Sequence, residues 1–279
     1  MSRVLRAVLG CFLGFVPCTW ASAKDLVTVN VASDRAAIVP GESVLIGVTY
    51  TIQPKWHIYW RNAGDTGAPT ELSVKAPKGF TVGPVMWPRP HIFTEQGDVS
   101  FGYETKATLF VRVEAPLTIE AEKVTFQITS EWLVCKGLCK FGEKRTSLEM
   151  PVLNRKSEIS QRGEPFVLEL KRIPKPLTAL NSAKASIVNG SILRIEGPSG
   201  TFQSVSFLPD HTPGVRYEGT LPHHGRVTDG HFLIEVSLDV NAGDALGKTL
   251  RAAGVVVFGK GDEDPAYDLS ITIPDVPRP

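Results

Sequence analysis

Several short segments of this chain carry an apolar residue at every second position, and a period of two predicts β-strands. The clearest segment contains Phe232, Ile234, Val236, Leu238 and Val240. The segments are separated by turns that use many of the 25 glycines and 21 prolines among the 279 residues. This pattern predicts an all-β protein.

The predicted strands fall into two groups along the chain. The first group has roughly seven strands before residue 153, a number typical of an immunoglobulin-like sandwich. Residues 154–178 are mostly polar and include one short apolar segment, as expected of a linker with one short helix. A second group of strands follows. We therefore predict two immunoglobulin-like β-sandwich domains in tandem, residues 24–153 and 179–279, joined by the linker of residues 154–178.

The N-terminus has the features of a secretory signal peptide. Arg3 and Arg6 precede an apolar run, and Ala21-Ser22-Ala23 has the small residues of a cleavage site. We predict that residues 1–23 are removed on export. No later segment has the roughly 18 apolar residues of a membrane helix, so a soluble exported protein is expected. The formal net charge of +1, without basic runs, gives no electrostatic footprint for nucleic acid.

Removal of the signal peptide would leave two of the four cysteines, Cys135 and Cys139. The segment before Cys135 alternates like a strand, so we expect the pair at a strand end and in the connection to the next strand. A structural disulfide that closes a loop of about five residues would contribute only roughly 2 kcal/mol. A metal site needs more ligands than two thiolates. Thiol–disulfide exchange is favoured by positive charge near the sulfurs, which Lys136 and Lys140 supply. All three interpretations stay open on spacing alone.

Other side chains are candidates for binding, and each has a structural alternative. Trp56, Tyr59 and Trp60 could line a groove or pack into the core. His223 and His224 are adjacent, so in an extended chain they point to opposite faces. For these two histidines a solvated loop is the better prediction than a metal site.

Four motifs occur in order along the first predicted domain. They are WHIYWRNAGDTGAPT (residues 56–70), VMWPRP (85–90), FGYE (101–104) and WLVCKGLC (132–139). In this combination, residues 26–153 resemble the periplasmic N-terminal domain of DsbD-type protein-disulfide reductases, above all the branch that includes the ScsB-like proteins. The second predicted domain is similar to the region that follows in that branch.

The resemblance implies an immunoglobulin-like sandwich whose cysteine pair takes electrons from a membrane donor and passes them to periplasmic partners. Such partners are disulfide isomerases and thioredoxin-like proteins, including those of cytochrome c maturation. By position, Cys139 matches the cysteine that forms the mixed disulfide, and Cys135 matches the one that resolves it. Phe93, in a loop of residues 89–97, matches a phenylalanine that caps the cysteines. Neither a cofactor nor a metal is expected. The aromatic residues expected to line the site are Trp56, Tyr59, Trp60 and Trp132.

The chain also departs from the family pattern. The best-known members have five residues between their cysteines and prolines after them, whereas here three residues intervene and Lys140-Phe141-Gly142 follows. The chain has no polytopic membrane segment and no thioredoxin-like C-x-x-C domain, so we expect a separate membrane protein as electron donor. Whether the module is an enzyme or a carrier stays open. Two other functions also stay open: a non-catalytic binding or chaperone-like sandwich with a permanent disulfide, and copper handling by the cysteines with Met86 or Met150.

Overall fold

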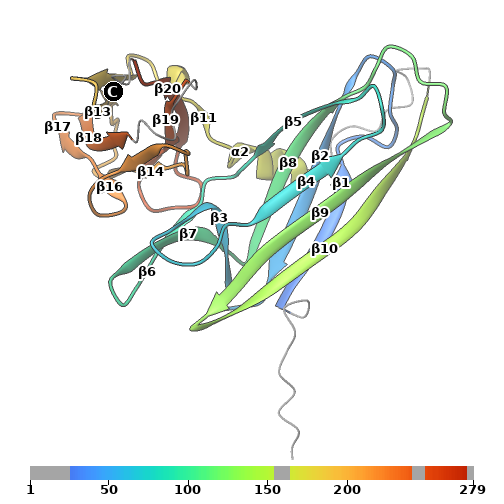
Figure 1. The fold of residues 1–279 in the computed structure, drawn as a ribbon, viewed down its shortest axis with the longest axis horizontal. Helices are drawn as coiled ribbons and strands as arrows, with labels where there is room; N and C mark the ends of the chain where they lie inside the picture. Colours follow the sequence, from blue (N-terminus) through green and yellow to red (C-terminus); the bar gives the residue numbers. More distant parts are fainter. Residues whose placement is uncertain (1–25, 154–163, 241–248, 275–279) are drawn as a thin grey trace, which may run out of the picture.

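The computed structural model describes residues 26–153, 164–240 and 249–274. The predicted signal peptide, residues 1–23, lies outside this part of the chain. Two layered β-structures follow each other along the described chain, and each consists of two sheets (Figure 1). The prediction of an all-β protein with two immunoglobulin-like sandwiches in tandem is therefore confirmed.

Among the described residues, ten strands form the first sandwich. In chain order they are β1 (Val27–Ser33), β2 (Ser43–Ile52), β3 (His57–Gly64), β4 (Glu71–Lys75), β5 (Thr81–Met86), β6 (His91–Glu95), β7 (Asp98–Glu104), β8 (Lys106–Glu114), β9 (Lys123–Lys136) and β10 (Leu138–Pro151). One sheet has the order β1-β2-β8-β5. The other has the order β10-β9-β3-β7-β6, with β4 also paired to β9. The motifs singled out in the sequence therefore come together mainly in the second of these sheets.

The core of the first sandwich lies between the two sheets and explains the alternation in the sequence. In β9, Val124, Phe126 and Ile128 are buried, while the residues between them are exposed. A hydrogen bond of 2.6 Å between the hydroxyls of Tyr50 and Ser130 joins the sheets across this core. Because successive strand residues point to opposite faces, the outer face of the β9 sheet is free to present other groups.

Strands and one short helix of the second half form the other sandwich. They are β11 (Lys175–Pro176), η2 (Leu177–Ala179), β12 (Lys184–Val188), β13 (Ile192–Pro198), β14 (Val205–Pro209), β15 (Val215–Tyr217), β16 (His223–His224), β17 (Arg226–Thr228), β18 (His231–Val240), β19 (Arg251–Phe258) and β20 (Ala266–Thr272). One sheet has the order β11-β20-β19-β14-β16, and the other has the order β12-β13-β18-β15, with β17 paired to β18. In β18, Phe232, Ile234, Val236 and Leu238 are buried, as the alternation predicts.

Helix α2 (Glu164–Lys171) lies within the segment predicted to be a linker, and it packs on the first sandwich. Phe166 is buried against Leu45 and Phe110, and its ring meets that of Phe110 edge-on at 5.3 Å. Gly47 has no side chain, and a Cβ there would lie 2.7 Å from the Phe166 ring. This part of the predicted linker is therefore attached to the first sandwich.

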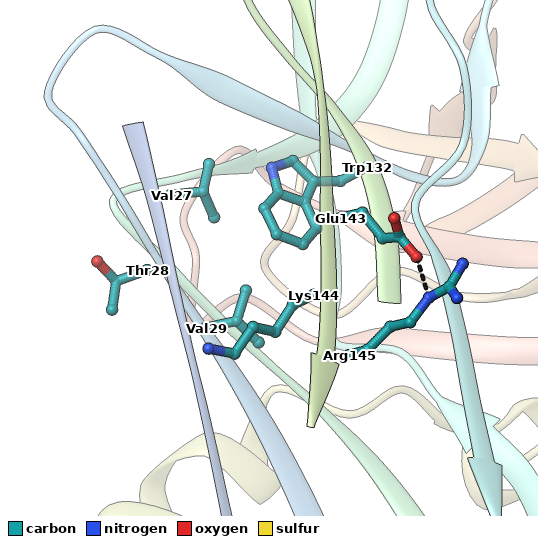
Figure 2. Close-up of a pocket in the computed structure, with 7 residues that line it drawn as sticks. All are labelled: Val27, Thr28, Val29, Trp132, Glu143, Lys144 and Arg145. Carbon is teal, nitrogen blue, oxygen red and sulfur yellow. Dashed lines mark hydrogen bonds and ion pairs between the residues drawn. The ribbon is translucent and has the colours of Figure 1, made fainter. Parts of the chain in front are cut away.

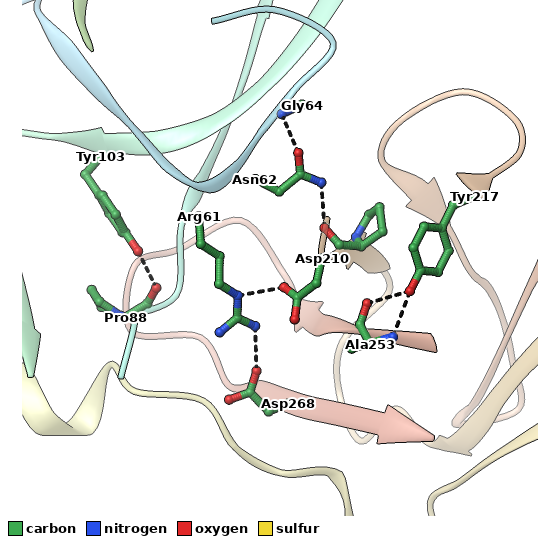
Figure 3. Close-up of polar contacts among 10 residues, drawn as sticks. Arg61, Asn62, Gly64, Pro88, Tyr103, Asp210, Tyr217, Ala253 and Asp268 are labelled. Atoms are coloured by element: carbon green, nitrogen blue, oxygen red, sulfur yellow. Dashed lines mark hydrogen bonds and ion pairs between the residues drawn. The ribbon is translucent and has the colours of Figure 1, made fainter. Parts of the chain in front are cut away.

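Polar and apolar contacts also join the two sandwiches. Arg61 Nε donates to Asp210 Oδ1 at 2.6 Å, and Arg61 Nη2 donates to Asp268 Oδ1 at 3.0 Å (Figure 3). Next to it, Asn62 Nδ2 donates to the carbonyl oxygen of Pro209 at 2.7 Å. Apolar side chains of β14, β19 and β20 extend the core cluster of the first sandwich. The second sandwich thus holds the end of β3, the strand that begins at the site described next.

Candidate functional site

The β9–β10 hairpin brings the two cysteines together. Cys135 and Cys139 stand directly opposite each other in the antiparallel ladder, with their Cα atoms 4.1 Å apart, and they form a disulfide. The ladder continues to the pair Lys136–Leu138, so Gly137 alone makes the turn, with a φ of +70° that favours glycine. The expectation that the pair would reach into a connection is therefore corrected: both cysteines lie within strands.

The two cysteines differ in exposure. Cys135 is 3 % exposed, whereas Cys139 lies in the exposed part of the hairpin. An attacking thiol needs access to the sulfur that it attacks. Cys139 is therefore the more accessible of the two sulfurs to a large partner.

A continuous row of residues crosses the outer face of the sheet at this point. Cys139 is paired with Cys135, Cys135 with His57 of β3, and His57 with Glu104 of β7. Tyr59, two residues after His57 on the same face, packs against Cys135. The site therefore includes His57, which the sequence analysis did not single out.

Phe93 covers His57. The two rings are stacked, with centroids 4.9 Å apart and planes 23° apart. Phe93 lies on β6, which forms a hairpin with β7 through a turn at Gln96 and Gly97, both with positive φ. The segment of residues 89–97, predicted to be a loop, is thus largely strand β6 and the turn to β7, and in the sheet β7 and β3 lie between β6 and the cysteine-bearing strand β9 (Figure 1).

The other predicted lining residues divide between the two faces of the sheet. Trp60 and Trp132 are buried in the core between the sheets, on the face opposite Cys135, which fits the core alternative weighed for strand aromatics. Trp56 is half-buried, and Lys140 Nζ lies 5.9 Å from its ring centroid. Of the four residues predicted to line the site, Tyr59 and Trp56 are therefore the two that lie near the cysteine pair.

Apolar and charged side chains surround the exposed cysteine. Leu138 is 71 % exposed and Phe141 is 63 % exposed. Phe141 follows Cys139 by two residues, so it lies on the same face of β10. Lys136 is exposed at the end of β9, and Arg145 forms an ion pair with Glu143 further along β10. This end of the hairpin presents an apolar surface with positive charge beside an accessible disulfide.

Burial changes the protonation of the groups next to the pair. The pKa of His57 is lowered from 6.5, chiefly by burial, which disfavours the imidazolium, while the charges of Glu95 and Glu104 oppose this shift. Burial, with a further contribution from Glu95, raises the pKa of Tyr59. His57 Nε2 has no hydrogen-bond partner among the described residues. The neutral imidazole is therefore the favoured form at neutral pH.

A separate pocket of about 450 Å³ lies between the edge strands β1 and β10 (Figure 2). Trp132 forms part of its wall, but neither cysteine lines it. The residues that line it are Val27, Thr28, Val29, Trp132, Glu143, Lys144 and Arg145.

The histidines and methionines weighed as metal ligands lie elsewhere. His223 is buried against Phe207 and Tyr217, and His224 accepts or donates a hydrogen bond of 2.9 Å with Ser206. The predicted solvated loop is therefore wrong for His223: as adjacent strand residues, the pair points to opposite faces, and one of these is the core. Met150 is buried in the first core, and Met86 packs beside Phe166. Among the described residues no cluster of three or more histidine, cysteine or acidic side chains could hold a metal ion.

Comparisons with known proteins found a matching family model and similar solved structures. Residues 23–151 match the family model described as the N-terminal region of the thiol:disulfide interchange protein DsbD. Among solved structures, the N-terminal periplasmic domain of ScsB from Proteus mirabilis matches with a TM-score of 0.58 and 16 % identity, over 91 % of this chain and 96 % of that one. The yeast GGA1 GAE domain matches with a TM-score of 0.26 and 16 % identity, over 44 % of this chain and 91 % of that one. No curated protein matches the sequence. No helix in the described ranges is long and apolar enough to span a membrane.

Proposed function

Residues 23–151 belong to the family of DsbD-type N-terminal domains, and we propose that the chain is a periplasmic module that relays reducing equivalents through Cys135 and Cys139. The observation that supports it most is the pairing of one buried and one exposed cysteine across a single ladder, within the region that matches the family. A relay needs one sulfur that a partner reaches and a second that is kept close to it but shielded.

The proposed reaction begins with both cysteines reduced. The Cys139 thiolate attacks a disulfide of the partner, an S–S bond forms between Cys139 and one partner sulfur, and the other partner sulfur leaves as a thiolate and takes up a proton. Cys135 then loses its proton and attacks Cys139 Sγ. The intramolecular disulfide forms, and the second partner sulfur leaves as a thiolate and is protonated. The partner gains two electrons and two protons, and this module becomes oxidised.

The proposal includes the surroundings of the reaction. Phe93 acts as a cap that limits access to the buried side of the pair, and Tyr59 and Trp56 form walls of the site. The partners are periplasmic thioredoxin-like proteins or disulfide isomerases, and a separate membrane protein returns electrons to the oxidised pair. The signal peptide of residues 1–23 directs the chain to the periplasm. In each cycle the module accepts electrons from the membrane donor and passes them to a periplasmic partner. It therefore works as a component of a thiol–disulfide oxidoreductase system.

The redox potential of the Cys135–Cys139 pair tests this function. The purified protein would be equilibrated in glutathione or dithiothreitol buffers, and free thiols would be counted by alkylation. A potential of roughly −200 to −270 mV, the range of several working oxidoreductases, supports the relay. A potential below about −300 mV is typical of structural disulfides. That result would reject the relay and favour a binding or chaperone-like sandwich with a permanent disulfide.

A further inference from the structure

We propose that His57 accepts the proton of the Cys135 thiol when that thiol attacks the mixed disulfide on Cys139. The inference rests on the proposed function and adds a residue to it. His57 becomes a catalytic residue that acts in the second, resolving step and not in the first.

The geometry places His57 for this role. His57 stands directly opposite Cys135 in the antiparallel pairing of β3 and β9, and side chains opposite each other in this way have Cβ atoms about 4.5–5.5 Å apart. They share one face of the sheet, with β3 between β9 and β7 (Figure 1). An imidazole on β3 is therefore within reach of a thiol on β9.

Two aromatic rings hold the imidazole in place. His57 is 7 % exposed, and its Nε2 has no hydrogen-bond partner in the described part of the chain. Phe93 stacks on one side of the ring at 4.9 Å, and Tyr59 meets it edge-on at 5.1 Å. A buried polar atom without a partner is unfavourable in a folded protein. A proton donor that is present only in the reduced state, the Cys135 thiol, would satisfy it.

The resolving step needs a base at this position. Cys135 is buried, and burial disfavours the thiolate, which is the attacking form. Of the lysines of this region, Lys136 is exposed at the end of β9, and the half-buried Lys140 lies near the Trp56 ring. Neutral His57 has a free lone pair, because burial lowers the pKa of its imidazole. The acidic groups that act on it are Glu95 from β6 and Glu104 from β7, and both favour the imidazolium once the proton arrives.

The step balances without any further reagent. The proton moves from Cys135 Sγ to the imidazole of His57 while Cys135 Sγ forms its bond to Cys139 Sγ. The bond between Cys139 and the partner sulfur breaks, and the electron pair leaves with the partner thiolate. The imidazolium then gives up its proton, to that thiolate or to water, and His57 is neutral again. This use of an adjacent base follows the general pattern of activated nucleophiles.

A chromogenic aromatic disulfide, 5,5′-dithiobis(2-nitrobenzoate), separates the two steps in the reduced protein. Attack by Cys139 releases one coloured thiolate at a rate that depends on reagent concentration. Attack by Cys135 releases the second at a rate that does not. We expect His57→Phe, which keeps a ring against Phe93, and His57→Gln to slow the second release about tenfold or more. The rate of the first release should stay within about twofold of that of the unmodified protein, because attack by Cys139 does not use His57 as a base.

The pH dependence distinguishes proton transfer from a structural role. In the unmodified protein the second release should slow as the pH falls through the pKa of His57, with the midpoint that NMR titration of this imidazole gives. In both variants this midpoint should vanish, and the rate should rise only in the alkaline range where thiols ionise by themselves. The matched control is His223→Phe, which replaces a histidine that is also 7 % exposed and also lacks a partner at Nε2. It should leave both releases unchanged.

Each result has a distinct meaning. Variants that are slow but keep the pH midpoint of the unmodified protein would overturn the proton-transfer role, and so would variants with unchanged second-release rates. If the variants fail to fold, the unmodified protein decides: a kinetic midpoint that differs from the NMR pKa of His57 overturns the inference. Release of only one thiolate per reduced protein would instead contradict the proposed function itself, because Cys135 would not resolve the mixed disulfide.

Discussion

Cys135 and Cys139 face each other across one ladder, yet they present different chemistry to a partner. Cys139 is exposed on the hairpin, whereas Cys135 lies 3 % exposed beneath it, between β3 and β10. Because an attacking thiol needs access to the sulfur with which it reacts, this difference in exposure supports the order of attack and resolution proposed above.

Single-cysteine variants test this order. Cys135→Ser should accumulate a mixed disulfide with a periplasmic thioredoxin-like protein or disulfide isomerase, because Cys139 still attacks and nothing resolves the product. Cys139→Ser should give little or none. Non-reducing gel electrophoresis after acid quenching measures both. A stable complex formed by Cys139→Ser, and absent from Cys135→Ser, would reverse the assignment.

Two buried histidines should make stability depend on pH. Burial lowers the pKa of His57 and of His223 from 6.5. Below that pH the unfolded chain binds more protons than the folded chain, so the free energy of unfolding should fall as the pH drops through 6.5 and below. Urea unfolding between about pH 7 and pH 5 measures the slope. His57→Phe and His223→Phe should each flatten it, and an unchanged slope in both would show that other groups dominate.

At the level of single residues, the sequence identifies the two cysteines of the site but few of the side chains around them. The cysteine spacing and the motif around it are local, so Cys135 and Cys139 could be selected from the sequence, whereas Phe93 was selected only through the family resemblance. The position of His57 opposite Cys135 depends on the register between β3 and β9, which are distant in sequence. Trp60 and Trp132 are aromatic strand residues like Tyr59, so residue type does not distinguish them. Only the face of the sheet to which each side chain points decides whether it lies in the core or near the cysteines.

Among the elements, two hairpins build the site from different sides. The β9–β10 hairpin holds the cysteines, and the β6–β7 hairpin holds Phe93. His91, at the start of β6, lies 2.8 Å from Asp262 of the second sandwich and 3.6 Å from Glu104 of β7. The hairpin that bears Phe93 thus contacts the second sandwich at the start of β6, and its turn at Gln96 and Gly97 lies at the other end of that strand.

Removal of the Phe93 ring should open the site. Phe93→Ala should speed reduction of the disulfide by dithiothreitol several-fold, because the ring no longer shields the buried side of the pair. It should lower the free energy of unfolding by only about 1 kcal/mol, the energy of a lost ring pair. Phe80→Ala is the matched control, since Phe80 is also half-buried and pairs with Phe126 at 5.6 Å. Equal reduction rates in all three proteins would exclude a shielding role.

The exposed apolar residues of the β9–β10 hairpin should serve partner docking. Phe141→Ser should slow exchange with a thioredoxin-like partner about tenfold, since a few exposed aromatic side chains supply much of the energy of an interface. It should leave the redox potential and the rate with dithiothreitol unchanged. Leu117→Ser is the control, because Leu117 is 86 % exposed but lies outside the hairpin. Stopped-flow kinetics with the same partner compares them, and equal losses in both variants would argue against a specific surface.

The elements themselves were largely predictable, because alternation is a local property. The strands of β9 and β18 appear in the sequence as unbroken alternation. The β6–β7 hairpin was not predicted, since Arg89–Gly97 contains one proline and few apolar residues, and its pairing depends on β7. The packing of α2 on the first sandwich was also missed, because the short apolar segment around Phe166 does not show what it covers.

The whole molecule depends on an interface whose contacts join residues far apart in sequence. Arg61 pairs with Asp210 and Asp268, and its side chain is 24 % exposed. Arg89 is 5 % exposed, and its Nη1 donates to the carbonyl oxygens of Phe258 at 2.7 Å and Asp264 at 2.8 Å. No local sequence pattern predicts such pairs, so the sequence indicated two domains but not the contacts between them. Because Arg61 lies on β3 and Arg89 precedes β6, the second sandwich supports both strands that frame the cysteine site.

Removal of the Arg61 side chain should therefore weaken the interface between the two sandwiches. Burial raises the pKa of Asp210 and of Asp268, and the Arg61 guanidinium opposes that rise. Arg61→Ala would leave two carboxylates close together without their cation, so it should lower the free energy of unfolding by about 2–4 kcal/mol at neutral pH. Differential scanning calorimetry should show one transition for the unmodified protein and two for the variant.

The pH dependence of this loss separates electrostatics from simple loss of packing. Without Arg61 the folded-state pKa of both carboxyls rises further above that of the unfolded chain, so the variant should lose stability as the pH rises through those values and regain it toward about pH 4. Arg194→Ala is the control, since it removes a more exposed ion pair with Glu235 within the second sandwich and should cost less than about 1 kcal/mol at any pH. If Arg61→Ala keeps a single transition and loses the same stability at neutral pH and at about pH 4, the ion pairs of Arg61 do not hold the two sandwiches together. Support of the site by the second sandwich would then rest on the apolar cluster alone.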